Sequence, residues 1–470
     1  MNFRAPAGVL QSCGATYSHE VGCSNQGLGG GQMRKLAYDG RGRDRDFAHS
    51  VRRTAALLAA ICAVPVLVFA GSAQQTSRPK EFKLAVVHSL TGVAAPHDEA
   101  AVKAAQLLVE EINREGGLRG VPIRLIIRDE EGPVDAKVAE FKRLVLEDGA
   151  DAVVGYTSSS KCLAVAPVAE EARVVAIFPI CGNHRLTEER RYRFVFRTAS
   201  HAALENVAAA RYVLEVKPDV RRVAGLNYDY AYGRDSWEMF IGALRKLKPD
   251  ITVVGETWVR FLETEYTAPI TQLLALKPDV IHTVNWGAGL TALIQQARVR
   301  GLLGGDSLLV MTTGLMDQAA MLPRGVAFSG RGYYLQYPDP RSNERNRRFM
   351  EAYRARFGKL PDYTGYYMAQ AILGLKAAVE RAVDIKGGQW PAPEEVARAL
   401  ENLRFQTPRG VVWVRPDHEA EHEAVWGVTS GRRDPVFGFP VLEKVRVFPA
   451  RQVFPPMGRK TMEWIREELR

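Results

Sequence analysis

One segment near the C-terminus has the residue types and spacing of a hydrolytic zinc site. His418-Glu419-Ala420-Glu421-His422 matches H-E-x-x-H, in which two histidines one helical turn apart bind zinc and the glutamate acts as general base. That chemistry needs a helix. Pro416 and Asp417 precede the segment and a strand-like run at 424–428 follows it, so we predict a polar turn. Zinc catalysis through His418 and His422 is kept only as an alternative.

Other catalytic signatures are absent from the sequence. Neither the dinucleotide fingerprint G-x-G-x-x-G after a strand nor the phosphate loop G-x-x-x-x-G-K-[ST] occurs. The nucleophile elbow G-x-S-x-G is also missing. We therefore predict a protein that is not an enzyme and that needs no cofactor and no metal.

A loop that leaves a predicted strand at 152–155 combines hydroxyl groups with a helix N-terminus. It includes Thr157, Ser158, Ser159 and Ser160 and ends at Lys161. The free N–H groups of a helix N-terminus, with serine hydroxyls beside them, can bind a carboxylate. The alternative is a serine that only caps the helix.

Aromatic residues with polar ends gather in two further loops. Tyr228, Tyr230 and Tyr232 follow one predicted strand, and Trp286 follows another. Such side chains suit a cleft for a small molecule. Ordinary packing explains any single one of them equally well.

Strands and helices alternate along the chain, and this alternation must position these loops. Helices between successive strands produce parallel sheets with helices on both faces. A bridge at 194–200 separates two such runs, so we predict an α/β fold with two doubly wound, parallel-sheet lobes. The patterns predict strands at 82–87, 123–127, 152–155, 174–178, 222–226, 251–257, 279–284 and 307–311, and helices at 98–115, 135–147, 160–172, 202–216, 233–247, 267–276 and 288–300.

The predicted topology selects the loops that form the site. In doubly wound sheets, ligands bind at the carboxyl ends of the strands. The loops at that edge are 88–97, 156–160, 180–183, 227–233, 285–288 and 312–316. The loop at 180–183 brings Cys181, Gly182 and Asn183 into the predicted site.

The N-terminal region has the features of an export signal. Arg52 and Arg53 precede an apolar run over 54–70, and small residues up to Ala73 follow it. We predict a signal peptide at 51–73, cleavage near Ala73 and a periplasmic mature protein. Residues 1–50 are expected to be a disordered extension, with a start at Met33 as the alternative.

Export leaves two of the five cysteines, Cys162 and Cys181. An even number in an oxidising compartment predicts one disulfide between them, and two buried thiols are the alternative. The net charge of +10 is spread over interleaved acidic and basic residues. Because no basic stripe with aromatic residues occurs, we predict no nucleic-acid partner.

Several segments, in this order, resemble the leucine/isoleucine/valine-binding protein family of periplasmic solute receptors. The similarity covers about residues 81–430, and its carrying segments are VVHSLTG (86–92), EINREGGLRG (111–120), Tyr232-Gly233, QARVRGL (296–302) and PDYTGYYMAQ (361–370). The resemblance implies a Venus-flytrap, in which two lobes close on an amino acid or a similar solute. The loaded protein, a monomer, would then dock on the membrane permease of an ABC transporter.

The resemblance also implies how the chain is divided. Lobe one would comprise 81–198 and 336–412, and lobe two 201–331 and 415–450. Three crossovers near 197–201, 330–336 and 412–416 would join the lobes. Residues 451–470 would form a C-terminal extension. A sensory binding protein of the same fold, without transport, is the alternative function.

By position, the resemblance assigns ligand contacts. Ser159 matches a carboxylate-binding serine, Tyr232 and Trp286 match aromatic positions, and His97 stands where an aromatic residue covers the ligand. Ser160, Cys181 and Asn183 complete the predicted site.

Two positions depart from the family's pattern. Gly182 replaces a threonine, and Thr313 replaces the acidic residue that pairs with the substrate ammonium. A buried ammonium without a carboxylate is costly. Asp229 or Asp317 could substitute for the lost acid. Otherwise a carboxylate without the amine, or an amide, becomes as plausible a ligand as an amino acid.

Overall fold

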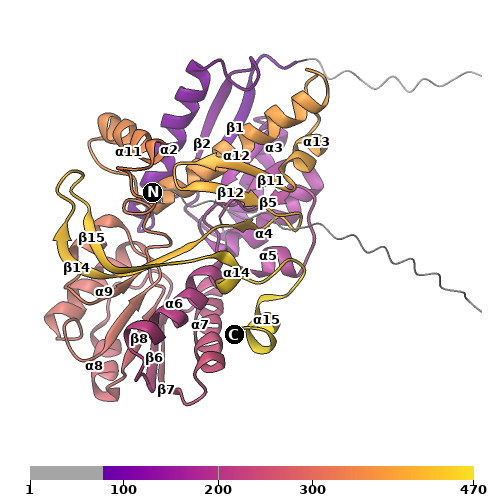
Figure 1. Ribbon diagram of the computed structural model, residues 1–470. Coiled ribbons are helices and arrows are strands. Elements are labelled where there is room, and N and C mark those ends of the chain that lie inside the picture. The colour runs from indigo at the N-terminus through magenta and orange to yellow at the C-terminus, as the bar shows by residue number, and fades with distance from the viewer. Residues whose placement is uncertain (1–77, 200) are drawn as a thin grey trace, which may run out of the picture. The chain divides into compact units, whose positions relative to one another are not determined.

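The computed structural model of the 470-residue chain describes residues 78–199 and 201–470 (Figure 1). The predicted extension at 1–50 and the predicted signal peptide at 51–73 lie outside the described residues. Within the described part, no helix combines the length and the apolar character that crossing a membrane requires.

Lobe one is built on a five-stranded parallel sheet. The strands are β1 (Phe82–His88), β2 (Ile123–Asp129), β3 (Ala152–Gly155), β4 (Val175–Ile177) and β5 (Val195–Phe196), in the order β2-β1-β3-β4-β5. The helices between them are α2 (Ala95–Arg114), α3 (Val134–Leu146), α4 (Ser159–Ala172) and α5 (Arg185–Glu188). Along β1, Leu84 and Val86 enter one core while Ala85 and Val87 enter another. Both faces of the sheet are therefore covered, as parallel strands require.

Lobe two is built on a seven-stranded sheet with an antiparallel edge. Its order is β15-β14-β10-β9-β8-β6-β7, where β6 is Arg222–Tyr228, β7 Thr252–Val259, β8 Val280–Thr283, β9 Leu308–Met311, β10 Ala327–Phe328, β14 Ala424–Arg433 and β15 Pro440–Phe448. The helices are α6 (Ala202–Val216), α7 (Ala231–Leu247), α8 (Thr267–Leu276), α9 (Gly287–Val299) and α10 (Met316–Met321). The predicted fold class, two parallel-sheet α/β lobes, is confirmed. Strands β14 and β15 pair antiparallel, which the alternation did not indicate.

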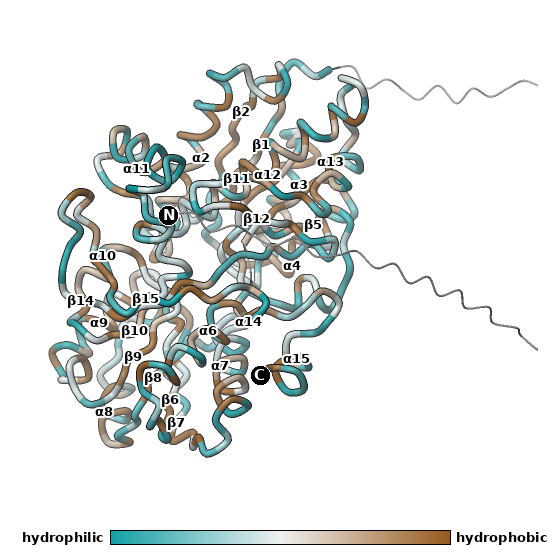
Figure 2. Tube along the Cα trace, viewed as in Figure 1, coloured by the Kyte–Doolittle hydropathy of each residue, from teal (hydrophilic) through white to brown (hydrophobic). Residues whose placement is uncertain are grey.

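The chain returns to lobe one before it ends in lobe two. Helix α12 (Tyr363–Ile385) packs on α2, preceded by α11 (Glu344–Phe357) and followed by α13 (Pro393–Leu400). A small antiparallel sheet of β11 (Leu403–Thr407), β12 (Gly410–Val414) and β13 (Ala420–Glu421) comes next. The chain thus passes between the two large sheets three times, after β5, after β10 and after β13. Figure 2 shows hydrophobic residues along the strands of both lobes and hydrophilic residues in the outer loops.

The C-terminal extension packs on lobe two. Helices α14 (Ala450–Val453) and α15 (Thr461–Glu467) contact α6 and α7. Phe454, Trp464 and Ile465 are buried in the same core as Phe240 and Leu244 of α7. The extension therefore adds apolar burial to this lobe, a role that the sequence left open.

Candidate functional site

The strand-end loops of both lobes meet in one narrow pocket. It measures about 10 Å³, which is room for about one water molecule. A solute of amino-acid size enters only when the lobes or the lining side chains move. The pocket is lined by His97, Thr157, Ser159, Ile180, Gly182, Tyr230, Tyr232, Trp286, Thr313, Arg331 and Tyr363.

Most of the predicted site residues lie in this pocket. They are His97, Ser159, Gly182, Tyr232, Trp286 and Thr313, whereas Ser160, Cys181 and Asn183 do not line it. Asn183 instead donates to Asp235 on α7 at 2.6 Å. Of the other lining residues, Thr157 and Tyr230 belong to loops that the sequence had singled out, Ile180 belongs to a loop that the strand-end rule had selected, and Arg331 and Tyr363 were not predicted.

An aromatic wall joins the two lobes. His97 at the start of α2 has its ring centroid 4.7 Å from that of Trp286, the residue that precedes α9. The indole N–H of Trp286 donates to the Tyr230 hydroxyl at 2.8 Å, and the Tyr228 hydroxyl donates to the Trp286 carbonyl at 2.9 Å. The ring of Trp286 is thereby fixed from lobe two and contacts lobe one. The pocket in this structure is closed across the lobes.

Gly182 is needed for the same closure. A Cβ atom at this position would lie 2.4 Å from Cε2 of Tyr232, which comes from the other lobe. Carbon atoms in contact are about 3.5–4.0 Å apart. The replacement of a threonine by Gly182 therefore has a steric reason, because it makes room for the Tyr232 ring.

Arg331 reaches the pocket from the second crossover. Gly330, Arg331 and Gly332 have φ values of 53°, 51° and 98°, so three successive left-handed residues turn the chain here. The guanidinium donates to the Ile180 carbonyl at 2.6 Å, and its Nε lies 3.4 Å from Oε1 of Glu205. Burial is the largest effect and disfavours the charged form of Arg331, but Glu205 and then the neighbouring tyrosines act in the opposite direction, and together they raise the pKa of Arg331. Arg331 is thus a buried, permanent cation.

The charge of the pocket lining is one-sided. Among the described residues that line it, Arg331 is the only lysine or arginine, and none is an aspartate or glutamate. Asp229 is exposed and pairs with Arg234 at 2.8 Å, and Asp317 is exposed on α10. Neither lines the pocket, so neither replaces the acidic partner that is lost at Thr313. The Thr313 hydroxyl itself donates to the Asn285 carbonyl.

Two amides of the serine-rich loop are bound to the protein's own Glu130. The N–H groups of Thr157 and Ser158 donate to its two carboxylate oxygens at 2.8 and 2.9 Å. Gly155 allows this path, because a Cβ there would lie 2.1 Å from the Val87 carbonyl oxygen. Glu130 therefore occupies the amides of Thr157 and Ser158, whereas the N–H groups of α4 itself, which begins at Ser159, are not among its donors. A serine cap is not formed either, because the side chain of Ser158, the N-cap residue, makes no capping bond.

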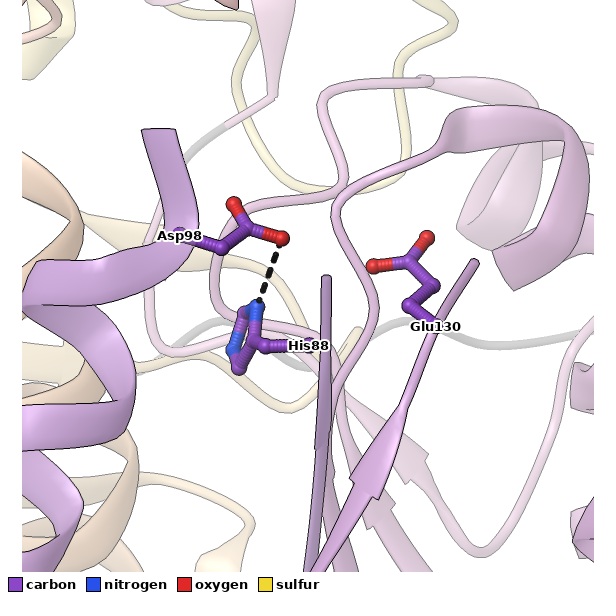
Figure 3. A group of neighbouring side chains, drawn as sticks. All are labelled: His88, Asp98 and Glu130. Carbon is purple, nitrogen blue, oxygen red and sulfur yellow. Dashed lines mark ion pairs between the residues drawn. The ribbon is translucent and has the colours of Figure 1, made fainter. Parts of the chain in front are cut away.

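A buried hydrogen-bonded network lies behind Thr157. Figure 3 shows Asp98 facing His88, with Glu130 nearby, directly after the end of β2. Asp98 accepts from the Ser89 N–H at 2.9 Å, from the Thr157 hydroxyl at 2.9 Å and from His97 at 2.7 Å. Burial would raise the pKa of Asp98, but His88 and then His97 hold it well below its usual range.

The same network has the donor atoms of a cation site. One ligand atom from each of His88, Asp98 and Glu130 lies within 4.8 Å of the others. However, both carboxylates already accept hydrogen bonds on each oxygen from the chain itself. The arrangement therefore serves to hold Thr157 and His97 in place. Burial and the neighbouring Asp98 raise the pKa of Glu130 to about 7.

Cys162 and Cys181 are free, buried thiols in this structure rather than the predicted disulfide. The Cys162 thiol donates to the Tyr156 carbonyl, and burial, followed by the neighbouring Cys181, raises the pKa of Cys162. Burial would also raise the pKa of Cys181, but Cys162 and then Arg197 lower that pKa below the ordinary value. The alternative of two buried thiols describes the structure.

The zinc-like segment forms a turn and a two-residue strand, not a helix. His418 has a φ of +67°, its Nδ1 bonds to the Val195 carbonyl at 2.8 Å, and its ring stacks on Phe196. His422 bonds to the Glu423 carbonyl at 3.0 Å. Within the described chain, these two histidines do not share a metal-binding group. The zinc alternative is therefore wrong, because the motif lacks the helix that would align its histidines.

Comparison with known proteins agrees with this geometry. Residues 81–429 match the family model described as periplasmic binding protein. The leucine-, isoleucine-, valine-, threonine- and alanine-binding protein of Pseudomonas aeruginosa is 24% identical over 73% of this chain and 88% of its own length.

Two solved structures share the fold at low sequence identity. A solute-binding protein of an ABC transporter from R. palustris, in complex with benzoate, has a TM-score of 0.67 at 20% identity and covers 78% of this chain and 97% of its own. One from Rhodopseudomonas palustris BisB5, in complex with 3,4-dihydroxybenzoic acid, has a TM-score of 0.68 at 19% identity and covers 79% and 98%. With a family match over most of its length, the chain belongs to the periplasmic binding protein family, whose members are binding proteins rather than enzymes.

Proposed function

We propose that this protein is the periplasmic solute receptor of an ABC importer and that its ligand is a small aromatic or apolar carboxylate. The observation that carries the ligand class is the charge of the lining, in which the cation Arg331 faces the pocket and no acidic residue does. An α-amino acid would bring a buried ammonium that no carboxylate of the lining pairs with, which is costly. An acid without the amine brings no ammonium, and its carboxylate can bind against Arg331.

The aromatic wall supports a flat or apolar ligand body. His97, Tyr230 and Trp286 present ring faces and edges to the pocket. The two R. palustris relatives are complexes with benzoate and a dihydroxybenzoate, which fits an aromatic acid. An amino acid is the second candidate, because the P. aeruginosa relative binds amino acids.

The predicted residues have complementary roles in this proposal. His97, Ser159 and Gly182 belong to lobe one, whereas Tyr232, Trp286 and Thr313 belong to lobe two. A ligand that touches both sets only when the lobes are shut stabilises the closed form. That form docks on the permease after export has removed a signal peptide near Ala73. A sensory receptor would use the same closure with another partner.

Matched pairs of acids and amino acids test the ligand class. We would record thermal unfolding of the exported, purified protein with 4-methylpentanoate against leucine, 3-phenylpropanoate against phenylalanine, and benzoate against benzamide. A ligand at about 100 times its dissociation constant adds roughly 2.7 kcal/mol to the free energy of unfolding. We expect a higher midpoint with the acids only.

Every other outcome of this panel would change one part of the proposal. A shift with leucine or phenylalanine but not with their acids would replace the proposed class by amino acids. A shift with benzamide equal to that with benzoate would show that Arg331 does not select an anion. No shift with any acid would overturn the proposed ligand class.

A further inference from the structure

Arg331 shares a buried ion pair with Glu205, the fourth residue of α6. Their side chains are 4% and 2% exposed, and Nε of Arg331 lies 3.4 Å from Oε1 of Glu205. Tyr367 of α12 places its hydroxyl 3.3 Å from the same oxygen. The other carboxylate oxygen, Oε2, is buried and has no hydrogen-bond partner within the described residues. The pair therefore lies directly behind the pocket, and one acceptor of Glu205 is unsatisfied.

The charges around this pair are balanced before a ligand arrives. Among the described residues, the groups that interact with Glu205 include Arg331 and four tyrosines, Tyr232 on α7, Tyr363 and Tyr367 on α12, and Tyr334 on the second crossover. The buried Arg409 and His422 lie behind these tyrosines, against Tyr334 and Tyr367 respectively. Burial raises the pKa of each of these tyrosines, so they stay neutral at physiological pH. One guanidinium thus faces one carboxylate.

An anionic ligand upsets this balance. A carboxylate that binds against Arg331 puts two negative charges beside one positive charge in a narrow and largely buried space. Leaving a buried charge uncompensated is strongly unfavourable, and a group in that position takes up a proton instead. We propose that Glu205 takes up one proton when the cleft binds an anionic ligand, so that the receptor captures an acid and a proton together. This inference rests on the proposed function.

Glu205 is the residue that the geometry selects for this proton. It contacts Arg331, the one lysine or arginine among the described residues of the lining, and burial raises the pKa of Glu205 above the ordinary value even with Arg331 beside it. Glu130 is also buried near the pocket, but its two oxygens already accept from the amides of Thr157 and Ser158. Asp98 is held ionised by His88 and His97. A ligand bound to Arg331 therefore changes the surroundings of Glu205 more than those of Glu130 or Asp98.

The direction of the pH effect follows from linkage. Because the ligand raises the pKa of Glu205, the complex binds more protons than the free receptor. The affinity is therefore highest at low pH and falls as the pH rises above the pKa of Glu205 in the free receptor. The fall approaches about tenfold per pH unit for one proton, until the pKa in the complex is passed.

Titration calorimetry with benzoate measures the proton directly. At about pH 7, the apparent binding enthalpy is compared in phosphate and in Tris, two buffers with different ionisation enthalpies. We expect uptake of up to one proton per benzoate in the unaltered protein, which needs no variant. Glu205→Gln, which mimics the protonated residue, should remove the uptake and the pH dependence, and at about pH 8 it should bind benzoate more tightly than the unaltered protein.

Glu419→Gln is the matched control, since Glu419 is another buried acid paired with a buried arginine, with its Oε1 3.0 Å from Nε of Arg197, and it does not line the pocket. It should keep the proton uptake. Benzoate binding without buffer dependence would overturn this inference and leave the proposed function standing. Loss of uptake in Glu419→Gln, with uptake kept in Glu205→Gln, would overturn the assignment to Glu205. If benzoate and every other acid of the panel failed to bind, the proposed ligand class itself would be overturned.

Discussion

Replacement of Gly182 by alanine tests whether the lobes close as the structure has them. The new Cβ would lie 2.4 Å from Cε2 and 2.7 Å from Cδ2 of Tyr232. Ordinary carbon contacts are about 3.5–4.0 Å long, so the ring must retreat by roughly 1 Å. Overpacking of this kind costs about 1–3 kcal/mol. The cost falls on the closed form, because the two residues belong to different lobes.

The expected result is a loss of affinity with little loss of stability. A penalty of about 1–3 kcal/mol on the liganded form weakens binding by roughly 5- to 150-fold. Calorimetry with the best acid of the panel measures this change, and thermal unfolding of the free protein checks that the lobes still fold. Gly305→Ala is the matched control, since Gly305 is exposed and its Cβ would meet only one atom, at 3.4 Å.

A compensating variant sharpens the test. Tyr232→Ala removes the ring that the new Cβ would strike, so Gly182→Ala should cost almost nothing in that background. The difference between the two backgrounds is the coupling energy of the pair. Equal losses in both backgrounds, or an unchanged affinity of the single variant, would refute the reasoning that Gly182 and Tyr232 meet in the closed form.

Three further predictions concern charge, pH and the C-terminal extension. Arg331→Gln should abolish acid binding. It should also lower the unfolding midpoint, because breaking a buried ion pair leaves Glu205 uncompensated at a cost of about 3–5 kcal/mol. Acid binding kept at full affinity would exclude Arg331 as the anion contact. The pKa of Glu130 is raised from 4.5 to about 7, so the folded state binds the extra proton and stability should fall as the pH rises from about 5 to about 7. Denaturant unfolding of Glu130→Gln should show a smaller fall over this range, and an identical pH profile would contradict the prediction. Ile465→Ala should lower the free energy of unfolding, measured with denaturant, by about 2–5 kcal/mol, because Ile465 is fully buried in the core shared with α7. Glu467 is exposed, so Glu467→Ala should leave the free energy of unfolding almost unchanged.

Local periodicity was sufficient for the elements and for much of the site. The alternation of strands and helices depends on residues that are close in the chain. The helices predicted at 202–216 and 267–276 agree with α6 and α8 to the residue. Since parallel strands present their carboxyl ends at one edge, the same pattern selected the loops that carry His97, Ser159, Tyr232 and Trp286. The resemblance then ordered these loops into two lobes.

Contacts between distant segments could not be deduced in this way. Arg331 lies on a crossover and Tyr363 begins α12, and neither follows a strand of the predicted sheets. The sequence contains many acids within reach of the serine-rich loop, and only the folded chain brings Glu130, 27 residues away, onto its amides. For the same reason, the motif at His418 and His422 matched a zinc site in spacing while its backbone forms a turn.

The sequence by itself determined the α/β class, the two lobes and the edge at which a ligand binds, because these depend on short-range periodicity and chain order. Only the tertiary structure decided the charge of the pocket. That charge depends on which buried groups lie against one another, Arg331 beside Glu205 and Asp98 beside His88 and His97. Such pairing depends on the distances between segments that are far apart in the chain. Because a buried charge without its partner is costly, the partner decides whether each buried group stays charged.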